Sequence, residues 1–323
     1  MASLLSVENL QVQFQTKKGI NTAVDGVSFS VEKGRILGIV GESGCGKSVT
    51  SMSILQLLGS NARISGGSIK LDGKELIGLP EKEMCRIRGN DIATIFQDPM
   101  TALNPTLTIG TQLMEPIMLH QNCGKKEAWT RAVDVLKRVG IAAPEKRMKE
   151  YPHQLSGGMR QRVMIAMAVS CEPRLLIADE PTTALDVTIQ AQILELMCEL
   201  REKMGTAIML ITHDMGVVAE TADDVLVLYA GKAVEYGSIE DIFERPKHPY
   251  TQGLLNSIPR LDEDVELLNT IEGTVPAPDA MPAGCRFAPR CPYGKDRCMK
   301  EKPGVYHAGN SLVSCFRYEG EKE

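Results

Sequence analysis

The chain lacks a net positive charge, a long apolar run and a tandem repeat. Its formal net charge is -5 over 323 residues, which argues against a nucleic-acid-binding protein, because contact with a phosphate backbone usually requires a basic face. No uninterrupted apolar stretch reaches the roughly 18 residues of a membrane-spanning helix, and residues 1–6 lack the segments of a secretory signal. We therefore expect an intracellular protein with no nucleic-acid partner and no bilayer span of its own.

The chain does contain enough apolar sequence for a large core. Hydrophobic residues make up 43% of it, and a chain of this length can form one large α/β domain with an appendage. Apolar runs at 36–40, 174–178 and 207–211 are predicted to be buried strands. Each of them is followed by residues with distinctive chemistry.

The first such segment is the glycine-rich loop at residues 41–48. Its sequence, Gly-Glu-Ser-Gly-Cys-Gly-Lys-Ser, matches G-x-x-x-x-G-K-[ST] at every fixed position, and it lies between the first strand and a predicted helix over 48–58. In that setting backbone N–H groups converge on phosphate oxygens, and the helix adds its positive end. Lys47 is predicted to reach the outer phosphates and Ser48 to bind Mg²⁺. The full match disfavours the alternative of a glycine-rich turn with an incidental lysine.

The second segment is the acidic end of the strand at 174–178. Asp179 and Glu180 follow this strand directly, where open α/β sheets bind ligands. Asp179 is predicted to hold Mg²⁺, directly or through water. Glu180 is aimed differently and could activate a water molecule as a general base. A pair of helix-capping residues is the alternative, which the nearby phosphate loop disfavours.

The third segment, at residues 155–161, indicates a second phosphate receptor. Ser156 is a good N-cap for a helix, and Gly157 and Gly158 leave the first N–H groups of that helix accessible to an anion. A second glycine-serine element this far downstream suggests a site that another chain completes. An ordinary capped helix is the alternative.

Together these segments resemble the ATP-binding cassette family, the nucleotide-binding subunits of ABC transporters. The family's order of motifs is found over about the first 245 residues. It includes Gln97 in an Ile-Phe-Gln-Asp-Pro segment, the signature at 155–161, Ala-Leu-Asp at 184–186, and His213 after the strand at 207–211.

The resemblance implies a role for each matching residue. Gln97 would reach Mg²⁺ and the attacking water, and His213 would contact the γ-phosphate; with Glu180 they form the expected catalytic set. Asp186 would lie along the interface between two subunits. The expected contacts of ATP are Phe14, Gly41, Ser43, Gly44, Cys45, Gly46, Lys47, Ser48 and Val49, and those of the partner-bound ATP are Ser156, Gly157, Gly158 and Gln161. Phe14, expected to stack on adenine, could equally be a core residue, and Val49 departs from the threonine of many relatives.

The expected fold follows the family. Residues 1–245 are predicted to form the α/β cassette, a phosphate-loop ATPase core with two additions. Alternating segments between residues 4 and 35 and between 62 and 75 predict an antiparallel β subdomain. A helical subdomain is expected over about 99–155, notably at 109–120 and 126–139. Two such chains would sandwich two ATP molecules.

After residue 245 the sequence becomes rich in proline, and strand and helix periodicity fades. This small extension, residues 246–323, holds four of the nine cysteines: Cys285, Cys291, Cys298 and Cys315. Disulfides are not expected in a reducing compartment, and thiolate ligation allows either zinc or an iron–sulfur cluster. The extension resembles that of oligopeptide and dipeptide importer ATPases, some of which carry a 4Fe-4S cluster, so we expect a cluster, with Zn²⁺ or no metal as alternatives.

The sequence therefore predicts an ATP- and Mg²⁺-dependent ATPase subunit of a di- or oligopeptide importer, most similar to the D-type subunit. The expected partners are two transmembrane permeases, a second ATPase that is a paralogue, and an extracytoplasmic solute-binding protein, with the chain at the cytoplasmic face of the cell membrane. Nickel or another small solute is an alternative cargo. A non-transport ABC ATPase is disfavoured, because only about 115 residues separate Gly41 from Ser156, without sustained heptads, and because one cassette without a tandem repeat is visible.

Overall fold

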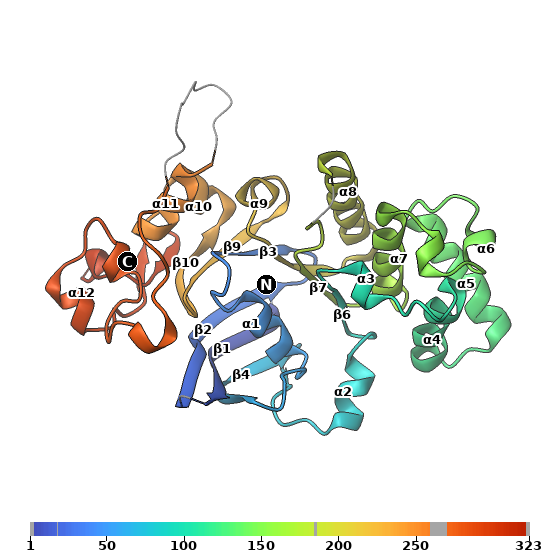
Figure 1. Cartoon of the computed structure of the whole chain (residues 1–323), viewed down its shortest axis with the longest axis horizontal. Coiled ribbons are helices and arrows are strands. Elements are labelled where there is room, and N and C mark those ends of the chain that lie inside the picture. Colours follow the sequence, from blue (N-terminus) through green and yellow to red (C-terminus); the bar gives the residue numbers. More distant parts are fainter. Residues whose placement is uncertain (1–2, 18, 184–185, 259–269, 321–323) are drawn as a thin grey trace.

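The computed structural model describes residues 3–17, 19–183, 186–258 and 270–320, which form two β-sheets with helices around them (Figure 1). The larger sheet has eight strands in the order β11-β12-β10-β9-β3-β8-β7-β6. Their bounds are β3 Ile36–Val40, β6 Ile92–Ile95, β7 Leu175–Asp179, β8 Ala207–Ile211, β9 Asp224–Tyr229, β10 Lys232–Ser238, β11 Tyr306–Ala308 and β12 Ser311–Val313.

The strands from β9 to β6 form the parallel part of this sheet. β3 pairs in parallel with β8 and with β9, and β7 pairs in parallel with β8 and with β6. Every residue of β3, β7 and β8 is buried, as expected for strands covered on both faces. The three apolar runs are therefore strands, and their carboxyl ends lie along one edge.

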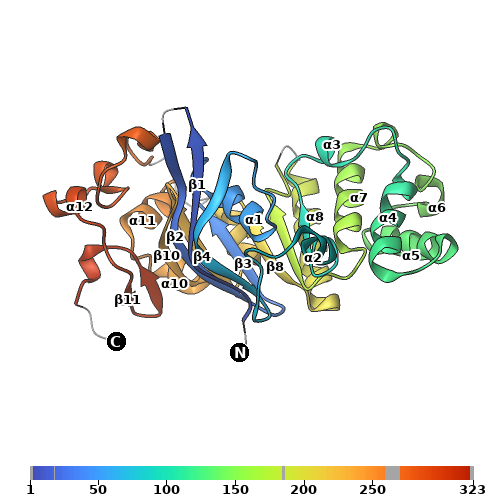
Figure 2. The same cartoon turned by 90° about the horizontal axis from the view of Figure 1, so that it is seen from below.

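The smaller sheet is antiparallel, in the order β2-β1-β4-β5. It comprises β1 Ser3–Thr16, β2 Gly19–Glu32, β4 Ala62–Leu71 and β5 Lys74–Glu75, which confirms the predicted antiparallel subdomain. Its buried residues share one apolar cluster with β3 and with α1, and Figures 1 and 2 show these blue strands lying against that part of the large sheet.

The helix after the glycine-rich loop is shorter than the sequence predicts. The apolar spacing favours a helix over 48–58, but α1 spans Lys47–Ile54. Gln56 adopts a φ of 50°, outside the helical region, and its side-chain amide donates to the carbonyl of Leu76. A contact with a distant segment therefore ends the helix where local periodicity would continue it.

A helical body lies at one end of the molecule (green in Figure 1). It contains α3 Pro99–Ala102, α4 Ile109–Gln121, α5 Lys125–Arg138, α6 Pro144–Arg147 and α7 Gly157–Val169, with α2 Glu81–Ile87 leading toward it. The helices predicted at 109–120 and 126–139 agree with α4 and α5. The N-cap of α4 is Thr108, whose hydroxyl accepts from the N–H of Thr111 at 3.3 Å.

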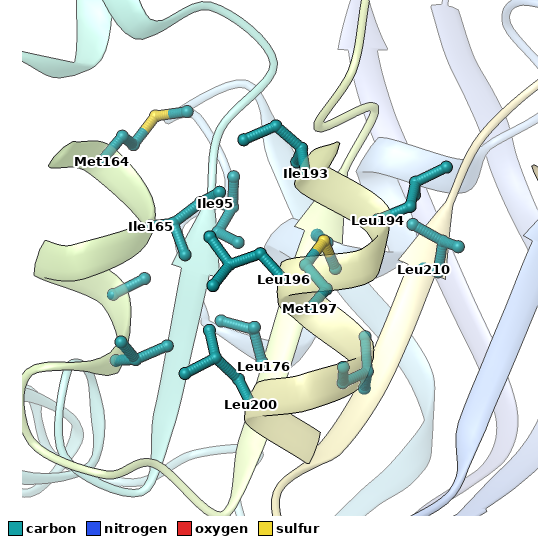
Figure 3. Packing of buried hydrophobic residues seen from close by; sticks show 14 of the residues in the cluster. Ile95, Met164, Ile165, Leu176, Ile193, Leu194, Leu196, Met197, Leu200 and Leu210 are labelled. Atoms are coloured by element: carbon teal, nitrogen blue, oxygen red, sulfur yellow. The ribbon is translucent and has the colours of Figure 1, made fainter. Parts of the chain in front are cut away.

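Helix α8, Val187–Met204, joins the helical body to the sheet. Figure 3 shows its buried face, with Ile193, Leu196 and Leu200 between residues of α7 and β7. These side chains belong to one apolar cluster. The other helices of the large sheet are α9 Met215–Thr221, α10 Ile239–Glu244 and α11 Pro249–Asn256.

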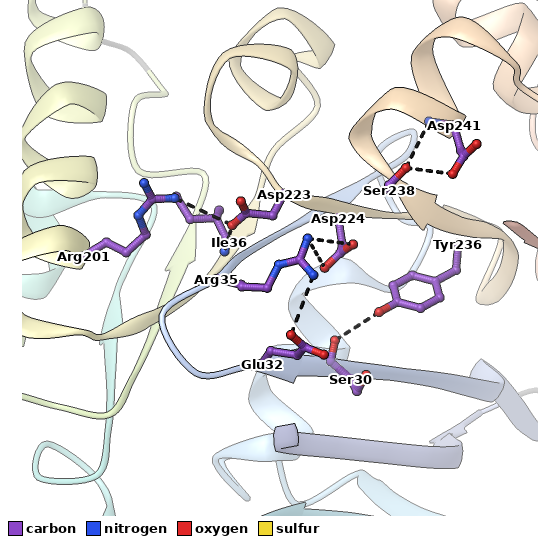
Figure 4. A network of polar contacts seen from close by, with 10 residues as sticks. All are labelled: Ser30, Glu32, Arg35, Ile36, Arg201, Asp223, Asp224, Tyr236, Ser238 and Asp241. Atoms are coloured by element: carbon purple, nitrogen blue, oxygen red, sulfur yellow. Dashed lines mark hydrogen bonds and ion pairs between the residues drawn. The ribbon is translucent and has the colours of Figure 1, made fainter. Parts of the chain in front are cut away.

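A polar network fixes the start of β3 (Figure 4). The Arg35 guanidinium forms ion pairs with Asp224 of β9 at 3.4 Å and with Glu32 of β2 at 3.7 Å. The carboxylate of Asp223 accepts the backbone N–H of Ile36 at 2.7 Å. Arg35 thus contacts both sheets immediately before the strand that leads to the phosphate loop.

The extension contains regular structure that the sequence did not predict. Strand β12 pairs with β10, placing Val313 opposite Glu235, and β11 then pairs with β12. Helix α12 spans Asp296–Lys300. A lack of periodicity in the sequence therefore does not exclude strands in the extension. β11 and β12 are only three residues each and depend on pairing with a distant strand.

Among the residues that the structure describes, no helix is long and apolar enough to cross a membrane.

We predict that Ile193→Ala lowers the free energy of unfolding by about 2–5 kcal/mol, because Ile193 is fully buried at 0% exposure and its truncation leaves a cavity. The matched control on the same helix is Val187→Ala, since Val187 is 84% exposed and should cost less than about 0.5 kcal/mol. Urea unfolding followed by circular dichroism would measure both. Equal effects would contradict the packing of α8 through this face.

Candidate functional site

Four predicted site segments meet at one edge of the large sheet. The glycine-rich loop follows β3, Gln97 follows β6, Asp179 and Glu180 end β7, and His213 follows β8. These strands are parallel, so their carboxyl ends lie side by side, where ligands bind in open α/β sheets.

Two glycines of the loop are required by their surroundings. Gly41 has a φ of 146°, and a Cβ there would lie 2.1 Å from the carbonyl oxygen of Leu228; Gly46 has a φ of 101°, and its Cβ would lie 3.0 Å from the carbonyl oxygen of Ala23. A side chain is excluded at Gly41 by the contact and is strained at both positions. Cys45 is buried, and its carbonyl accepts the N–H of Gly231 at 2.8 Å. The loop is therefore enclosed by the β9–β10 turn and β2.

The middle of the loop is open. A Cβ placed at Gly44, whose φ is 76°, would have no atom within 4 Å, and Ser43 is exposed.

Lys47 closes the loop on itself. Its Nζ atom donates to the carbonyl oxygen of Gly41 at 2.6 Å and to that of Glu42 at 3.2 Å, and the side chain is buried. The ammonium group is thus held by carbonyl oxygens of the loop whose N–H groups a phosphate would contact.

Ser48 and Asp179 form a polar pair beside Lys47. The Ser48 hydroxyl hydrogen-bonds to the Asp179 carboxylate, which is 8% exposed. Burial raises the pKa of Asp179, the charge of Glu180 adds to that rise, and Ser48 and Lys47 oppose it. A cation at this position would favour the charged carboxylate, and a hydroxyl with a carboxylate is a donor set that suits Mg²⁺.

Glu180 lies at the centre of a hydrogen-bonded cluster. Its φ is 48°, an uncommon value for a non-glycine residue. Gln97 donates from Nε2 to Glu180 Oε2 at 2.9 Å, and His213 Nδ1 lies 3.4 Å from Oε1. The structure therefore brings together all three residues of the expected catalytic set.

Sequence reasoning missed one member of this cluster. Thr183 donates its hydroxyl to Glu180 Oε2 at 3.1 Å, and its N–H donates to the Glu180 carbonyl at 3.2 Å. A hydroxyl residue three positions after an acidic strand end is a turn signal that could have identified it.

The signature residues divide between the surface and the interior. Ser156 is exposed, and its hydroxyl accepts the N–H of Met159 at 3.3 Å, so it caps α7 as expected. Gly157 is also exposed, and Gly158 approaches Ile189 of α8. Gln161 is 1% exposed, and its amide donates to the carbonyl of Pro181. Its side chain thus ties α7 to the residue after Glu180 and does not lie on the exposed surface with Ser156.

Asp186 is exposed and caps α8, since its Oδ1 accepts the N–H of Ile189 at 2.9 Å. Residues 184 and 185, which complete the Ala-Leu-Asp segment, lie outside the described residues. The close approach of Gly158 to Ile189 places the starts of α7 and α8 beside each other.

Phe14 and Val49 are not part of the cluster at the strand ends. Both are half-buried and pack against the apolar cluster shared by the small sheet and α1. In β1, Phe14 lies between Asn21 and Ala62 of the neighbouring strands.

The four cysteines of the extension surround one cavity of about 80 Å³, which His248 and Phe287 also line. Burial raises the pKa of Cys285 to about 11 and also raises the pKa values of Cys291 and Cys315. Among the described residues, no group of three or more His, Cys, Asp or Glu side chains is placed to hold a single metal ion. The thiols converge on a shared space without meeting at one point.

Solved structures resemble about three quarters of the chain. A dimeric structure of the ATP-binding cassette MJ0796, in a post-hydrolysis state with ADP and Pi, has a TM-score of 0.65 and 27% identity over 73% of this chain and 98% of that chain. The cbiO1 protein of Clostridium perfringens, part of the ABC transporter complex cbiONQ, also has a TM-score of 0.65, with 28% identity over 76% of this chain and 92% of that chain.

Sequence comparisons cover the whole chain. The family model "ABC transporter" matches residues 24–183, and "Oligopeptide/dipeptide transporter, C-terminal region" matches residues 234–298. The oligopeptide transport ATP-binding protein AppD of Bacillus subtilis is 56% identical over 99% of this chain and 98% of its own length. OppD of Escherichia coli, of the same description, is 51% identical over 98% of this chain and 93% of its own length. The chain therefore belongs to the ATP-binding subunits of ABC transporters, within the oligopeptide and dipeptide transporter group.

Proposed function

We propose that this ATPase subunit energises the uptake of di- or oligopeptides through partner membrane permeases. The observation that carries the proposal is the convergence of Lys47, Asp179 and Glu180 at one sheet edge, in a chain whose relatives are named for oligopeptide and dipeptide transport. The cargo would be chosen by a separate binding protein and the permeases. Nickel or another small solute is therefore the alternative cargo for the same machinery.

The residues of the phosphate loop would bind ATP. The loop amides and the start of α1 would receive phosphate oxygens, and Lys47 would exchange its bonds to Gly41 and Glu42 for the outer phosphates. Ser48 and Asp179 would hold Mg²⁺, with Gln97 beside them. Mg²⁺ held by these residues would supply positive charge to offset the negative charge that develops on the phosphates. Phe14 is proposed to stack on adenine, with Ser43, Gly44, Cys45 and Val49 completing the ATP contacts.

Glu180 would act as the general base. Its carboxylate is held by Gln97, Thr183 and His213, so its orientation is set before a water molecule arrives, and it would take a proton as the water attacks the γ-phosphate. His213, 64% exposed, can turn toward the γ-phosphate.

A second ATPase subunit, expected to be a paralogue, would complete each site. Ser156 and Gly157 present the start of α7 at the surface, next to Asp186 at the start of α8, and would receive the ATP held by the partner. Shifting a closure equilibrium from 1:99 to 99:1 takes about 5.5 kcal/mol of differential binding. Two ATP molecules that contact both subunits are a reasonable source of that energy.

The permeases would dock beside the helical body. A groove of about 390 Å³ runs between β6, α4 and α7 and is lined by Phe96 and Leu119 among others, which are 40% and 67% exposed. Exposed large apolar residues around a groove are typical of an interaction site. This docking would place the chain at the cytoplasmic face of the cell membrane, with the extracytoplasmic binding protein on the other side.

The cysteines of the extension are proposed to hold a 4Fe-4S cluster. The four thiols surround one cavity of about 80 Å³, and thiolate ligation alone allows zinc or an iron–sulfur cluster. The resemblance of the extension to that of peptide-importer ATPases favours the cluster. A cluster bound by Cys285, Cys291, Cys298 and Cys315 would link four segments of the extension.

Glu180→Gln is expected to lower the rate of ATP hydrolysis about 10²- to 10⁴-fold, because it removes the base but keeps the size of the side chain. ATP affinity should change little, and a closed dimer with bound ATP should accumulate. Steady-state hydrolysis and size-exclusion chromatography with the partner ATPase would measure this. The control is Glu199→Gln on α8, whose contact is an exposed pair with Lys203. Normal turnover in Glu180→Gln would exclude Glu180 as the base.

Lys47→Ala is expected to weaken ATP binding by about tenfold or more, since a charged hydrogen bond contributes about 1.5–3 kcal/mol. Isothermal titration calorimetry with Mg²⁺ and ATP would measure the affinity. Lys70→Ala, in an exposed ion pair with Glu8, serves as the control and should bind as the unmodified chain does. An unchanged affinity in Lys47→Ala would contradict the assignment of the phosphate loop.

Anaerobically purified protein is expected to contain about four irons per chain and to show the visible absorbance of an iron–sulfur cluster. Cys285→Ser should lose both signals, whereas Cys85→Ser, at an exposed cysteine outside the extension, should keep them. Elemental analysis decides between the alternatives. If zinc is found without iron, the site binds Zn²⁺ and not a cluster. If neither metal is found, the extension has no metal site.

A further inference from the structure

An arginine of the extension reaches the phosphate loop. Arg290 ends the short helix η3, Ala288–Arg290, and precedes Cys291. Its Nη1 lies 2.8 Å from Oε2 of Glu42, and its Nη2 lies 3.1 Å from Oε1. This two-pronged ion pair joins residues 248 positions apart, one of them the second residue of the loop.

Every hydrogen-bond donor of the Arg290 guanidinium has a partner in this position. Besides the two bonds to Glu42, Nε donates to the carbonyl of Glu272 at 3.0 Å, Nη2 to that of Ile271 at 3.2 Å, and Nη1 to the Tyr229 hydroxyl at 3.4 Å. Arginine has five N–H donors in a fixed fork, and each has a partner here. The side chain is 6% exposed. A lysine could not make this set of contacts.

Glu42 is held from a second direction by the same part of the chain. Its backbone N–H donates to the hydroxyl of Tyr250 at 3.0 Å. Tyr250 is 0% exposed and packs its ring against Tyr229 at 4.7 Å and Phe287 at 5.4 Å. Because these rings are buried, the hydroxyl has a fixed position.

The carbonyl of Glu42 completes the arrangement, since it accepts from Lys47 Nζ at 3.2 Å and from the N–H of Cys45 at 3.2 Å. The carboxylate, N–H and carbonyl of this one residue are therefore all engaged. The phosphate-loop pattern leaves this position free, so the pattern assigns Glu42 no role.

We propose that Arg290 and Tyr250 are positioning residues for ATP binding, which hold the phosphate loop in its binding conformation through Glu42. A loop that is already ordered loses less conformational freedom when the ligand binds. The extension thereby sets the affinity of the cassette for ATP without contacting ATP. This inference deepens the proposed function and rests on ATP binding by the loop.

The test is the ATP dissociation constant of Arg290→Met, Glu42→Gln and their double variant, measured by isothermal titration calorimetry on the full chain with Mg²⁺. Each single variant should weaken ATP binding about three- to tenfold. The double variant should weaken it no further than whichever single variant binds more weakly, because both changes break the same ion pair. With the partner ATPase, the KM for ATP should rise while kcat at saturating ATP stays within about twofold. Tyr250→Phe, which removes only the hydroxyl, should weaken binding about twofold.

The matched control is Arg297→Met. Arg297 has the same charge and also precedes a cysteine, but it pairs with Glu301 at 2.8 Å and with Glu319, inside the extension. It should bind ATP as the unmodified chain does. Thermal unfolding of every variant would detect loss of folding, and Glu42→Gln tests the pair from the loop side if Arg290→Met does not fold.

Three results would overturn the proposal: unchanged ATP affinity in Arg290→Met and Glu42→Gln, single effects that multiply in the double variant, or an equal loss in Arg297→Met. Lys47→Ala in the same assay distinguishes a failure of the positioning proposal from a failure of the phosphate-loop assignment. If Lys47→Ala weakens binding and the Arg290 series does not, the loop assignment stands and the positioning role is wrong.

Discussion

The site depends on one constraint, the parallel alignment of β3, β8, β7 and β6. Because these strands run in the same direction, the residues that follow each of them meet at one edge, although Gln97 and His213 are more than 100 positions apart. Burial of the strands on both faces keeps the edge rigid. At that edge two adjacent carboxylates have different partners, since Asp179 lies beside Ser48 and Glu180 beside Gln97.

The parts that could be predicted from the sequence are those that local chemistry determines. The loop at 41–48 has glycines where the enclosing backbone leaves no room for a side chain, and strands buried on both faces appear as short apolar runs. The capping role of Ser156 is predictable because capping depends on the residue itself and its next few neighbours. These features make the cassette and its principal site recognisable from the sequence.

The parts that could not be predicted depend on partners far along the chain. Gln161 belongs to the signature, yet its burial against Pro181 follows from how α7 packs. The end of α1 depends on Gln56 reaching Leu76. The contact of Arg290 with Glu42 joins residues 248 positions apart, and no periodic pattern in the sequence indicates it. The short strands of the extension could not be predicted either, because a strand of three residues is too short to show an alternating pattern.

Pairing of the extension with β10 also determines where the large sheet stops. With β12 in place, the sheet ends at β11, a strand of three residues that offers little backbone to another chain. Without the extension, β10 would become the edge, with a run of seven residues whose N–H and C=O groups could pair with a second molecule. The cysteine-bearing segment is therefore also a cover against edge-to-edge aggregation, and a cassette truncated near residue 245 would be prone to self-association.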